Sequence, residues 1–241
     1  MSISSGLLYA GNNQVSGASW LDLSGNGNNI PLTNTSWETG GLQANANGEL
    51  GTIDNTSEML FNSEAGTLTM QFESLSAFAD NTIRVLFGKF NSTHVAGDIK
   101  LYKFSNNILY FGIYDSSLHY IALNADKLTN WETGVRVSVL WDRANNIHDS
   151  KKMAFNIDGT HITPDASSNA DAWNSFTVTN TLAMLNDISN TNNDANGISN
   201  NAYVFNTVKT EAELTAIATD HNIILRDYRG KPSYSIPIFF S

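Results

Sequence analysis

The sequence contains no cysteine, which excludes disulfide bonds, thiolate metal sites and cysteine nucleophiles. It also contains no run of 18 apolar residues, the length that a membrane-spanning helix requires. Lysine and arginine number 13 against 23 acidic residues, for a net charge of -10, and the basic residues form no block. Such a chain does not suit the phosphate backbone of a nucleic acid, so we expect no nucleic-acid partner and no membrane span.

Charge of either sign is scarce as well. Charged residues make up 15% of the chain, compared with about 25% in an average soluble domain. Asparagine is abundant instead, with 31 residues, beside many serines, threonines and 17 glycines. This composition is typical of turns, loops and strand edges. A length of 241 residues is sufficient for one large β domain.

Alternation of apolar and polar residues, which is typical of half-buried strands, recurs along most of the chain. It is clearest in residues 67–74, 134–142 and 151–158. Weaker examples occur in residues 82–90, 98–104, 107–114, 118–123, 176–184 and 202–206. Short strands at this spacing predict an all-β fold, a two-sheet antiparallel jelly-roll sandwich.

Two dipeptides predict β-hairpins. Asp158-Gly159 separates two apolar stretches, and an Asp-Gly pair readily takes the positive φ values of a type I′ turn. Asn106-Asn107 is expected to form a similar turn, because asparagine tolerates the left-handed region. The Asn-rich stretch 186–201 is expected to form one long loop.

One segment predicts a helix near the C-terminus. Thr210 and Glu213 have the spacing of a capping box, and Leu214 and Ile217 follow on one helical face, which predicts a helix of about ten residues. We expect a last strand at 223–228, so that residues 1–228 form the jelly-roll domain and 229–241 an extended arm.

The arm ends in an apolar cluster that would be an aggregation hazard if nothing covered it. We expect it to dock on its own sandwich or on a neighbouring subunit of a homo-oligomer. The predicted assembly residues are Ile236, Ile238, Phe239 and Phe240.

A polar run near the N-terminus, WLDLSGNGNN at residues 20–29, forms a candidate loop site. Asp22, Asn26 and Asn28 supply side-chain oxygens, and Ca²⁺ takes six to eight oxygen ligands. The alternative is an Asx-type turn in which Asp22 accepts backbone N–H groups and no metal is needed. We expect no required cofactor, with calcium as the candidate ion.

The same run, preceded by GLLYAG and followed by Gly40-Gly41, resembles the opening of concanavalin A-like, laminin G-like jelly-roll domains. It is most similar to versions found in bacteriophage structural proteins and bacterial surface proteins. Segments 67–72, 131–142, 153–159 and 199–214 resemble later landmarks of the family in the same order. Asn200-Asn201 stands where the family usually carries paired acidic residues, which weakens the case for a metal shared with Asp22.

Signatures of catalysis are missing from the sequence. Laminarinase-type glycosidases of this fold carry Glu-x-Asp-x-x-Glu on one strand, and the chain has no such motif. Its five histidines are scattered, and no Gly-x-Ser-x-Gly elbow precedes a helix. We therefore expect that the protein is not an enzyme.

Aromatic rings that stack on sugars, together with Asn and Asp side chains that pair with hydroxyls, are the expected means of binding carbohydrate. Trp131 and Trp141 flank an apolar strand and are expected in the core. The candidate carbohydrate-binding residues, taken as exposed, are Trp37, Tyr114, Tyr120 and Trp173. The alternative is that each has a structural role, such as capping a sheet edge at Trp173.

These features favour a non-enzymatic surface protein of a bacteriophage virion, such as a capsid decoration, head fibre or tail-associated adhesin. The N-terminus does not resemble a secretory signal peptide. We therefore expect synthesis in the host cytoplasm, display on the virion surface, and contacts with other virion proteins and cell-surface glycans. The alternative is an extracellular carbohydrate-binding module or lectin of a bacterium, whose binding either depends on calcium or does not.

Overall fold

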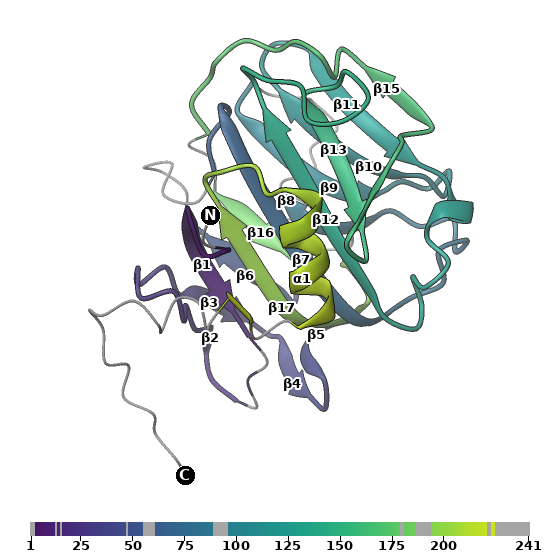
Figure 1. Ribbon diagram of the computed structural model, residues 1–241. Helices are drawn as coiled ribbons and strands as arrows, with labels where there is room; N and C mark the ends of the chain where they lie inside the picture. The colour runs from purple at the N-terminus through teal and green to yellow at the C-terminus, as the bar shows by residue number, and fades with distance from the viewer. Residues whose placement is uncertain are drawn as a thin grey trace.

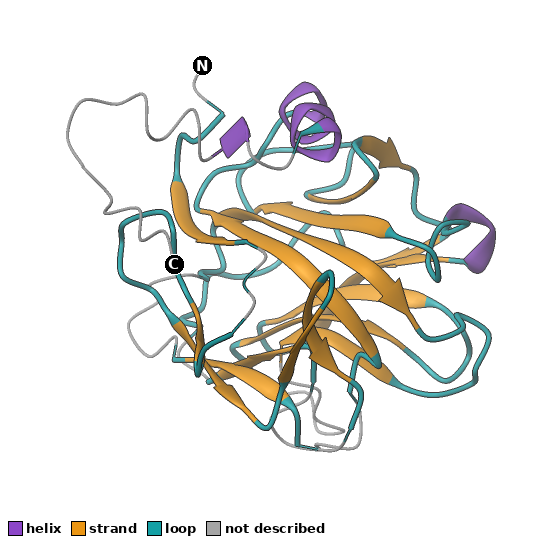
Figure 2. Cartoon of the chain, turned by 90° about the horizontal axis from the view of Figure 1, so that it is seen from below, coloured by secondary structure: helices purple, strands orange, loops and turns teal. Residues whose placement is uncertain are grey.

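The computed structural model describes residues 3–12, 14, 16–46, 48–54, 61–88, 96–178, 181–186, 194–220 and 223–224. Two antiparallel sheets stack as a sandwich, and one short helix lies outside them (Figures 1 and 2). The predicted all-β, two-sheet architecture with a helix near the C-terminus is confirmed.

The first sheet has eight strands in the order β14-β13-β12-β7-β17-β5-β4, and β1 also pairs with β17. In chain order these strands are β1 (Leu7–Gly11), β4 (Ser36–Glu38), β5 (Gly41–Ala44), β7 (Ala65–Leu75), β12 (Val135–Asp142), β13 (Met153–Ile157), β14 (Thr160–Ile162) and β17 (Gly197–Phe205). Strand β17 is central because it pairs with β7 on one side and with β5 and β1, one after the other, on the opposite side.

The second sheet has nine strands in the order β15-β11-β10-β9-β8-β16-β6-β3-β2. In chain order they are β2 (Ser19–Trp20), β3 (Ile30–Thr33), β6 (Leu50–Ile53), β8 (Arg84–Gly88), β9 (Asp98–Lys103), β10 (Leu109–Tyr114), β11 (Leu118–Leu123), β15 (Ala166–Ser168) and β16 (Leu182–Met184). A 3-10 turn, η1 (Ala125–Lys127), follows β11.

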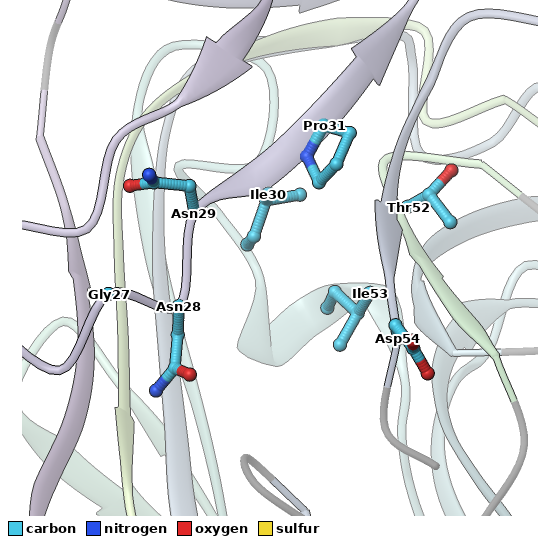
Figure 3. Close-up of a pocket in the computed structure, with 8 residues that line it drawn as sticks. All are labelled: Gly27, Asn28, Asn29, Ile30, Pro31, Thr52, Ile53 and Asp54. Atoms are coloured by element: carbon cyan, nitrogen blue, oxygen red, sulfur yellow. The ribbon is translucent and has the colours of Figure 1, made fainter.

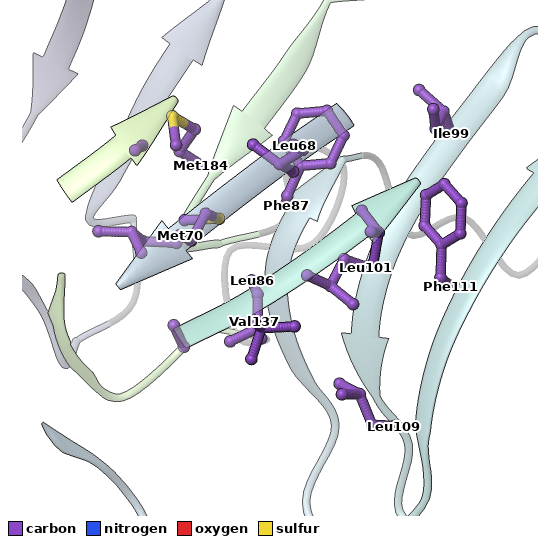
Figure 4. Close-up of a cluster of buried hydrophobic side chains, with 14 of the residues drawn as sticks. Leu68, Met70, Leu86, Phe87, Ile99, Leu101, Leu109, Phe111, Val137 and Met184 are labelled. Carbon is purple, nitrogen blue, oxygen red and sulfur yellow. The ribbon is translucent and has the colours of Figure 1, made fainter. Parts of the chain in front are cut away.

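The main core lies between the two sheets. Leu68, Met70 and Val137 of the first sheet face Leu101 and Phe111 of the second in this layer (Figure 4). Burial of each such side chain stabilises the fold by about 1.5–3 kcal/mol. Trp131 and Trp141 are buried, as predicted.

A second, smaller core lies on the outer face of the first sheet, beneath α1 (Glu211–Thr219). Leu214 and Ile217 of the helix pack there with Leu140 and Ala154 of β12 and β13. Both halves of the predicted capping box are present: the Thr210 hydroxyl accepts the Glu213 N–H, and the Glu213 carboxylate accepts the Thr210 N–H at 2.9 Å. The helix is thus both capped and anchored.

The two predicted hairpins are present, with one difference in turn type. Asp158 (φ 50°) and Gly159 (φ 90°) form the two-residue turn between β13 and β14. Between β9 and β10 only Asn107 is left-handed (φ 59°), and the Phe104 N–H donates to the Ile108 carbonyl. This loop therefore has three residues rather than the two expected.

Other sequence predictions were wrong in part. Six short strands, β1 to β6, precede residue 54 and were not predicted, because strands of two to five residues give little alternation. Among the described residues of the strand expected at 176–184, only Leu182–Met184 is a strand, and the loop expected at 186–201 gives way to β17 at Gly197. Of the strand expected at 223–228, the structure describes only Ile223 and Ile224, which are helical, and the Ile223 N–H donates to the Asp220 carbonyl. Residues 225–241, including the arm and its predicted assembly residues Ile236, Ile238, Phe239 and Phe240, lie outside the described residues.

Candidate functional site

The Asp22 loop is organised by its own hydrogen bonds. The Asp22 carboxylate accepts the backbone N–H groups of Ala10 (3.1 Å), Ser24 (2.9 Å) and Asn28 (3.0 Å). The backbone N–H of Asp22 donates to the Asn29 side-chain carbonyl at 2.8 Å. This is the Asx-type arrangement given as the alternative to a metal loop.

The amide groups of the loop also point inward. Asn26 donates from Nδ2 to the carbonyls of Leu7 (3.0 Å) and Leu8 (3.1 Å), and Asn28 donates to the Leu8 carbonyl at 2.8 Å. These bonds attach the loop to β1. Within the part of the chain that the structure describes, no three His, Cys, Asp or Glu side chains are grouped as metal ligands. The calcium site of Asp22, Asn26 and Asn28 therefore stays a prediction.

Beside this loop, strands β3 and β6 separate. They pair through Leu32 and Gly51, and the Leu32 N–H points the other way, to the Ala18 carbonyl at 3.0 Å. Since N–H groups alternate along a strand, an N–H at residue 31 would point toward β6. Residue 31 is proline and has none, so the ladder lacks a bond at this point.

The separation leaves a pocket of about 270 Å³. Ile30, Pro31 and Ile53 form its apolar part, and Figure 3 shows the Ile30 and Ile53 side chains between the two separated segments. Its polar lining consists of Asn28, Asn29, Thr52 and Asp54. Amide, hydroxyl and carboxylate groups around an apolar floor can bind a small polyhydroxylated ligand.

Of these lining residues, sequence reasoning identified only Asn28. Pro31 beside an Asn-rich loop was the one usable hint, because proline weakens pairing at that position. Thr52 and Asp54 come from a strand that the alternation did not predict, and nothing in the sequence places that strand opposite Pro31.

Two of the four predicted carbohydrate-binding aromatics are not exposed, which corrects the premise of that prediction. Tyr114 is 1% exposed, and the Lys100 ammonium lies 4.3 Å from its ring centroid. Trp173 is 6% exposed, belongs to the main core and donates from its indole to the Ser63 carbonyl at 2.9 Å. Both face packed protein, so neither ring offers a face to a sugar.

The other two are partly exposed. Trp37 of β4 packs edge-on against Trp20 with ring centroids 6.5 Å apart, and its indole donates to the Gly17 carbonyl at 2.9 Å. Tyr120 belongs to a row of three tyrosines on neighbouring strands of the second sheet. Tyr110 lies between Tyr102 and Tyr120, with ring centroids 5.4 Å and 5.5 Å away.

A histidine–carboxylate pair is also present. His119 Nε2 lies 2.9 Å from Asp115 Oδ1, and its Nδ1 lies 3.0 Å from the Asn169 carbonyl. Burial by itself raises the pKa of Asp115, but hydrogen bonds from the N–H groups of Asn174 and Ser116 outweigh burial, and this pKa lies well below its usual value. Because both ring nitrogens are engaged with protein acceptors, the ring has no position left to act as a base on a substrate.

No protein-family model and no curated protein matches the sequence. Solved structures share its fold. The receptor-binding domain of botulinum neurotoxin D superposes with a TM-score of 0.65 and 12% identity, covering 91% of this chain and 54% of that one. Trypanosoma rangeli sialidase gives 0.61 and 12%, covering 91% of this chain and 33% of the enzyme. At this identity the likeness concerns the fold alone, and this chain spans about half or less of those structures.

A neurotoxin binding domain of serotype DC, in complex with rat synaptotagmin II, gives a TM-score of 0.60 at 12% identity over 90% of this chain and 52% of that one. Among the residues that the structure describes, no helix is both long and apolar enough to cross a membrane.

Proposed function

We propose that this chain is a non-catalytic binding module for glycans and that the pocket between β3 and β6 is its binding site. The observation that carries the proposal is the composition of the pocket wall. Thr52 and Asp54 bring hydrogen-bonding groups to it, as does the Asn29 amide nitrogen, while the Asn29 carbonyl accepts the Asp22 N–H; Ile30 and Ile53 offer an apolar surface. A pyranose has both kinds of surface, with hydroxyls around its rim and C–H groups on its faces.

The fold is compatible with this role. The structures that share it include a neurotoxin receptor-binding domain and a sialidase solved with a difluorosialic acid. The partly exposed Tyr110 and Tyr120, which lie three or more strands away from the pocket in the same sheet, supply a second, separate aromatic surface.

The absence of catalysis is part of the proposal. The Asp115–His119 pair uses its polar atoms on protein partners. The pocket contains one carboxylate, Asp54, whereas glycoside hydrolysis typically needs two flanking the scissile bond. Incubation with a polysaccharide panel should release no reducing sugar.

We place this module on the surface of a bacteriophage particle, supported by the resemblance of the Trp20–Asn29 run, with the C-terminal arm joining subunits or virion proteins. Weak glycan contacts would then gain strength from multiple copies. Neighbouring genes for capsid or tail proteins are expected. The alternative, an extracellular bacterial lectin, predicts glycan binding that is lost on chelation of calcium.

Glycan binding is tested on an array, followed by titration calorimetry with the best ligand. We expect Thr52→Val and Asp54→Ala each to weaken binding about tenfold, because each removes one hydrogen bond worth about 1.4 kcal/mol. Thr33→Val is the matched control, since Thr33 lies on β3 but does not line the pocket. Binding that is unchanged in both pocket variants but lost in Tyr120→Ala would move the site to the tyrosines.

Assembly is tested separately by light scattering. The wild-type chain is expected to be an oligomer, and the double variant Phe239→Ser, Phe240→Ser a monomer. A wild-type monomer would count against the arm as an assembly element and leave the glycan proposal standing.

A further inference from the structure

Three polar side chains on the outer face of the first sheet carry buried atoms that have no hydrogen-bond partner among the residues that the structure describes. Arg136 of β12 is 2% exposed, and its Nε and Nη1 atoms have no acceptor. Asn156 of β13 is fully buried, and neither its Oδ1 nor its Nδ2 has a partner. His161 of β14 is partly exposed, but its Nε2 is buried and also unpartnered. We call these three residues the Arg136 row.

Strand register places the three residues together. Asn156 pairs with Ser138, which lies two residues from Arg136 and on the same face of β12. His161 pairs with Asn156 on the other side. Cross-strand and diagonal neighbours on one face are within reach of long side chains. The row therefore forms one polar patch across three strands.

Helix α1 lies over the outer face of the first sheet (Figure 1), and its contacts place it beside the row. The Glu211 carboxylate accepts the backbone N–H of His161 at 2.9 Å, and the Thr215 hydroxyl donates to the Gly159 carbonyl at 2.7 Å. Leu140 and Ala154, which share the face of the row, pack with Leu214 and Ile217 of the helix. The unpartnered groups thus lie beside an apolar cluster, where a lost hydrogen bond is costly.

The charge of the row defines its ligand. A buried guanidinium without an ion pair is strongly unfavourable, and burial is the largest cause that lowers the pKa of Arg136, to about 10. Tyr203 and Asp158 partly oppose this lowering of the pKa, but Asp158 Oδ1 accepts the Arg136 backbone N–H, at 2.7 Å, and not the guanidinium. An acceptor with negative charge would satisfy the Arg136 guanidinium and the Nδ2 donor of Asn156 together, although not the Asn156 Oδ1.

We propose that the Arg136 row binds an oxyanion beneath α1, with the Arg136 guanidinium as the charged donor and Asn156 Nδ2 as the second donor. Two sources share this chemistry: the carboxylate of an acidic sugar, and inorganic sulfate or phosphate. The net charge of -10 disfavours anions elsewhere on the protein, so binding would depend on this local cation. The site is independent of the pocket between β3 and β6.

The test is thermal unfolding of the full chain at constant ionic strength, titrated with sodium glucuronate, sulfate or phosphate, and with glucose as the uncharged sugar. We expect a rise in Tm that saturates with at least one oxyanion and is absent with glucose. A response to glucuronate alone identifies the sugar carboxylate, and one to sulfate or phosphate the inorganic ion. Sulfate also stabilises proteins generally, so the response of Arg136→Met is subtracted.

Asn156→Asp gives a second, independent measurement. It places a carboxylate beside Arg136, so we expect a higher Tm without added anion and no further oxyanion response. Asn34→Asp is the matched control: Asn34 is exposed, and the substitution adds the same charge away from the row. Equal responses in wild type and Arg136→Met would overturn the proposal, as would an Asn156→Asp chain that is less stable and still responds.

Discussion

The Asp22 loop and the Arg136 row are both polar clusters attached to a β-sandwich, and they differ in how their hydrogen bonds are satisfied. Asp22 accepts three backbone N–H groups, and the neighbouring amides bind the carbonyls of β1. Arg136 and Asn156 lie under a helix and carry donor and acceptor atoms that have no partner within the described part of the chain.

This difference shows that residue composition and unsatisfied hydrogen bonds can point to different places in the molecule. A loop rich in Asp, Asn and Gly suggests a ligand site in the sequence, yet its polar groups satisfy one another and hold the chain in place. A strand residue such as Asn156 attracts no notice in the sequence, yet its unpaired amide is the kind of buried group that requires an explanation. Buried groups whose hydrogen bonds are unsatisfied are therefore a better guide to a site than composition.

The largest effect on stability is expected from a substitution that removes the central acceptor of the Asp22 loop. Asp22→Ala leaves the N–H groups of Ala10, Ser24 and Asn28 without their acceptor, and we expect a loss of about 3 kcal/mol in the free energy of unfolding. Urea denaturation followed by circular dichroism measures it. Asp22→Asn, which keeps one oxygen acceptor, should lose about half as much. A loss below about 0.5 kcal/mol for Asp22→Ala would show that the loop does not depend on this carboxylate.

A substitution in the Arg136 row is expected to raise the free energy of unfolding rather than lower it. Arg136→Met removes an unpaired buried charge and keeps an apolar side chain of similar length, so without oxyanions we expect a gain of about 1 kcal/mol in the same assay. Arg136→Lys keeps the charge and should show no gain. A clear loss of stability in Arg136→Met would mean that Arg136 is already satisfied and that the contrast with Asp22 is wrong.

The fold was more predictable from the sequence than the site. Long strands such as β7 and β12 alternate apolar and polar residues, a pattern that indicates a strand with one apolar face, and the capping box at Thr210 is a local sequence signal for a helix start. The pocket depends on β6 lying opposite Pro31, a non-local pairing without a local pattern. Burial of Tyr114 depends in the same way on what packs against an outer face. Both are decided by tertiary contacts, which periodicity does not encode.

A smaller effect on stability is expected from a substitution at the start of α1, the helix that lies over the Arg136 row. Thr210→Ala removes the N-cap of α1 and should cost about 1 kcal/mol, because the Glu213 N–H loses its acceptor. Hydrogen exchange of the α1 amides should become faster, whereas that of β12 should change little. Thr39→Ala, on an exposed turn, is the control. Unchanged exchange in α1 would show that packing of Leu214 and Ile217 holds the helix without its cap.

The smallest effect is expected in the pH dependence of stability, and it concerns His161. This residue differs from His119, whose two ring nitrogens both have partners. Burial is the largest cause that lowers the pKa of His161, and His148 adds to it while Glu211 opposes it. A folded-state pKa below the unfolded value of about 6.5 means that this histidine's contribution to stability is present above pH 6.5 and is lost as the pH falls toward the folded pKa. The free energy of unfolding should therefore decrease slightly between pH 7 and pH 5 in the wild type, and less in His161→Gln. Identical pH profiles for the two proteins would mean that His161 gains a proton as easily in the folded chain as in the unfolded one, and that its Nε2 has a partner after all.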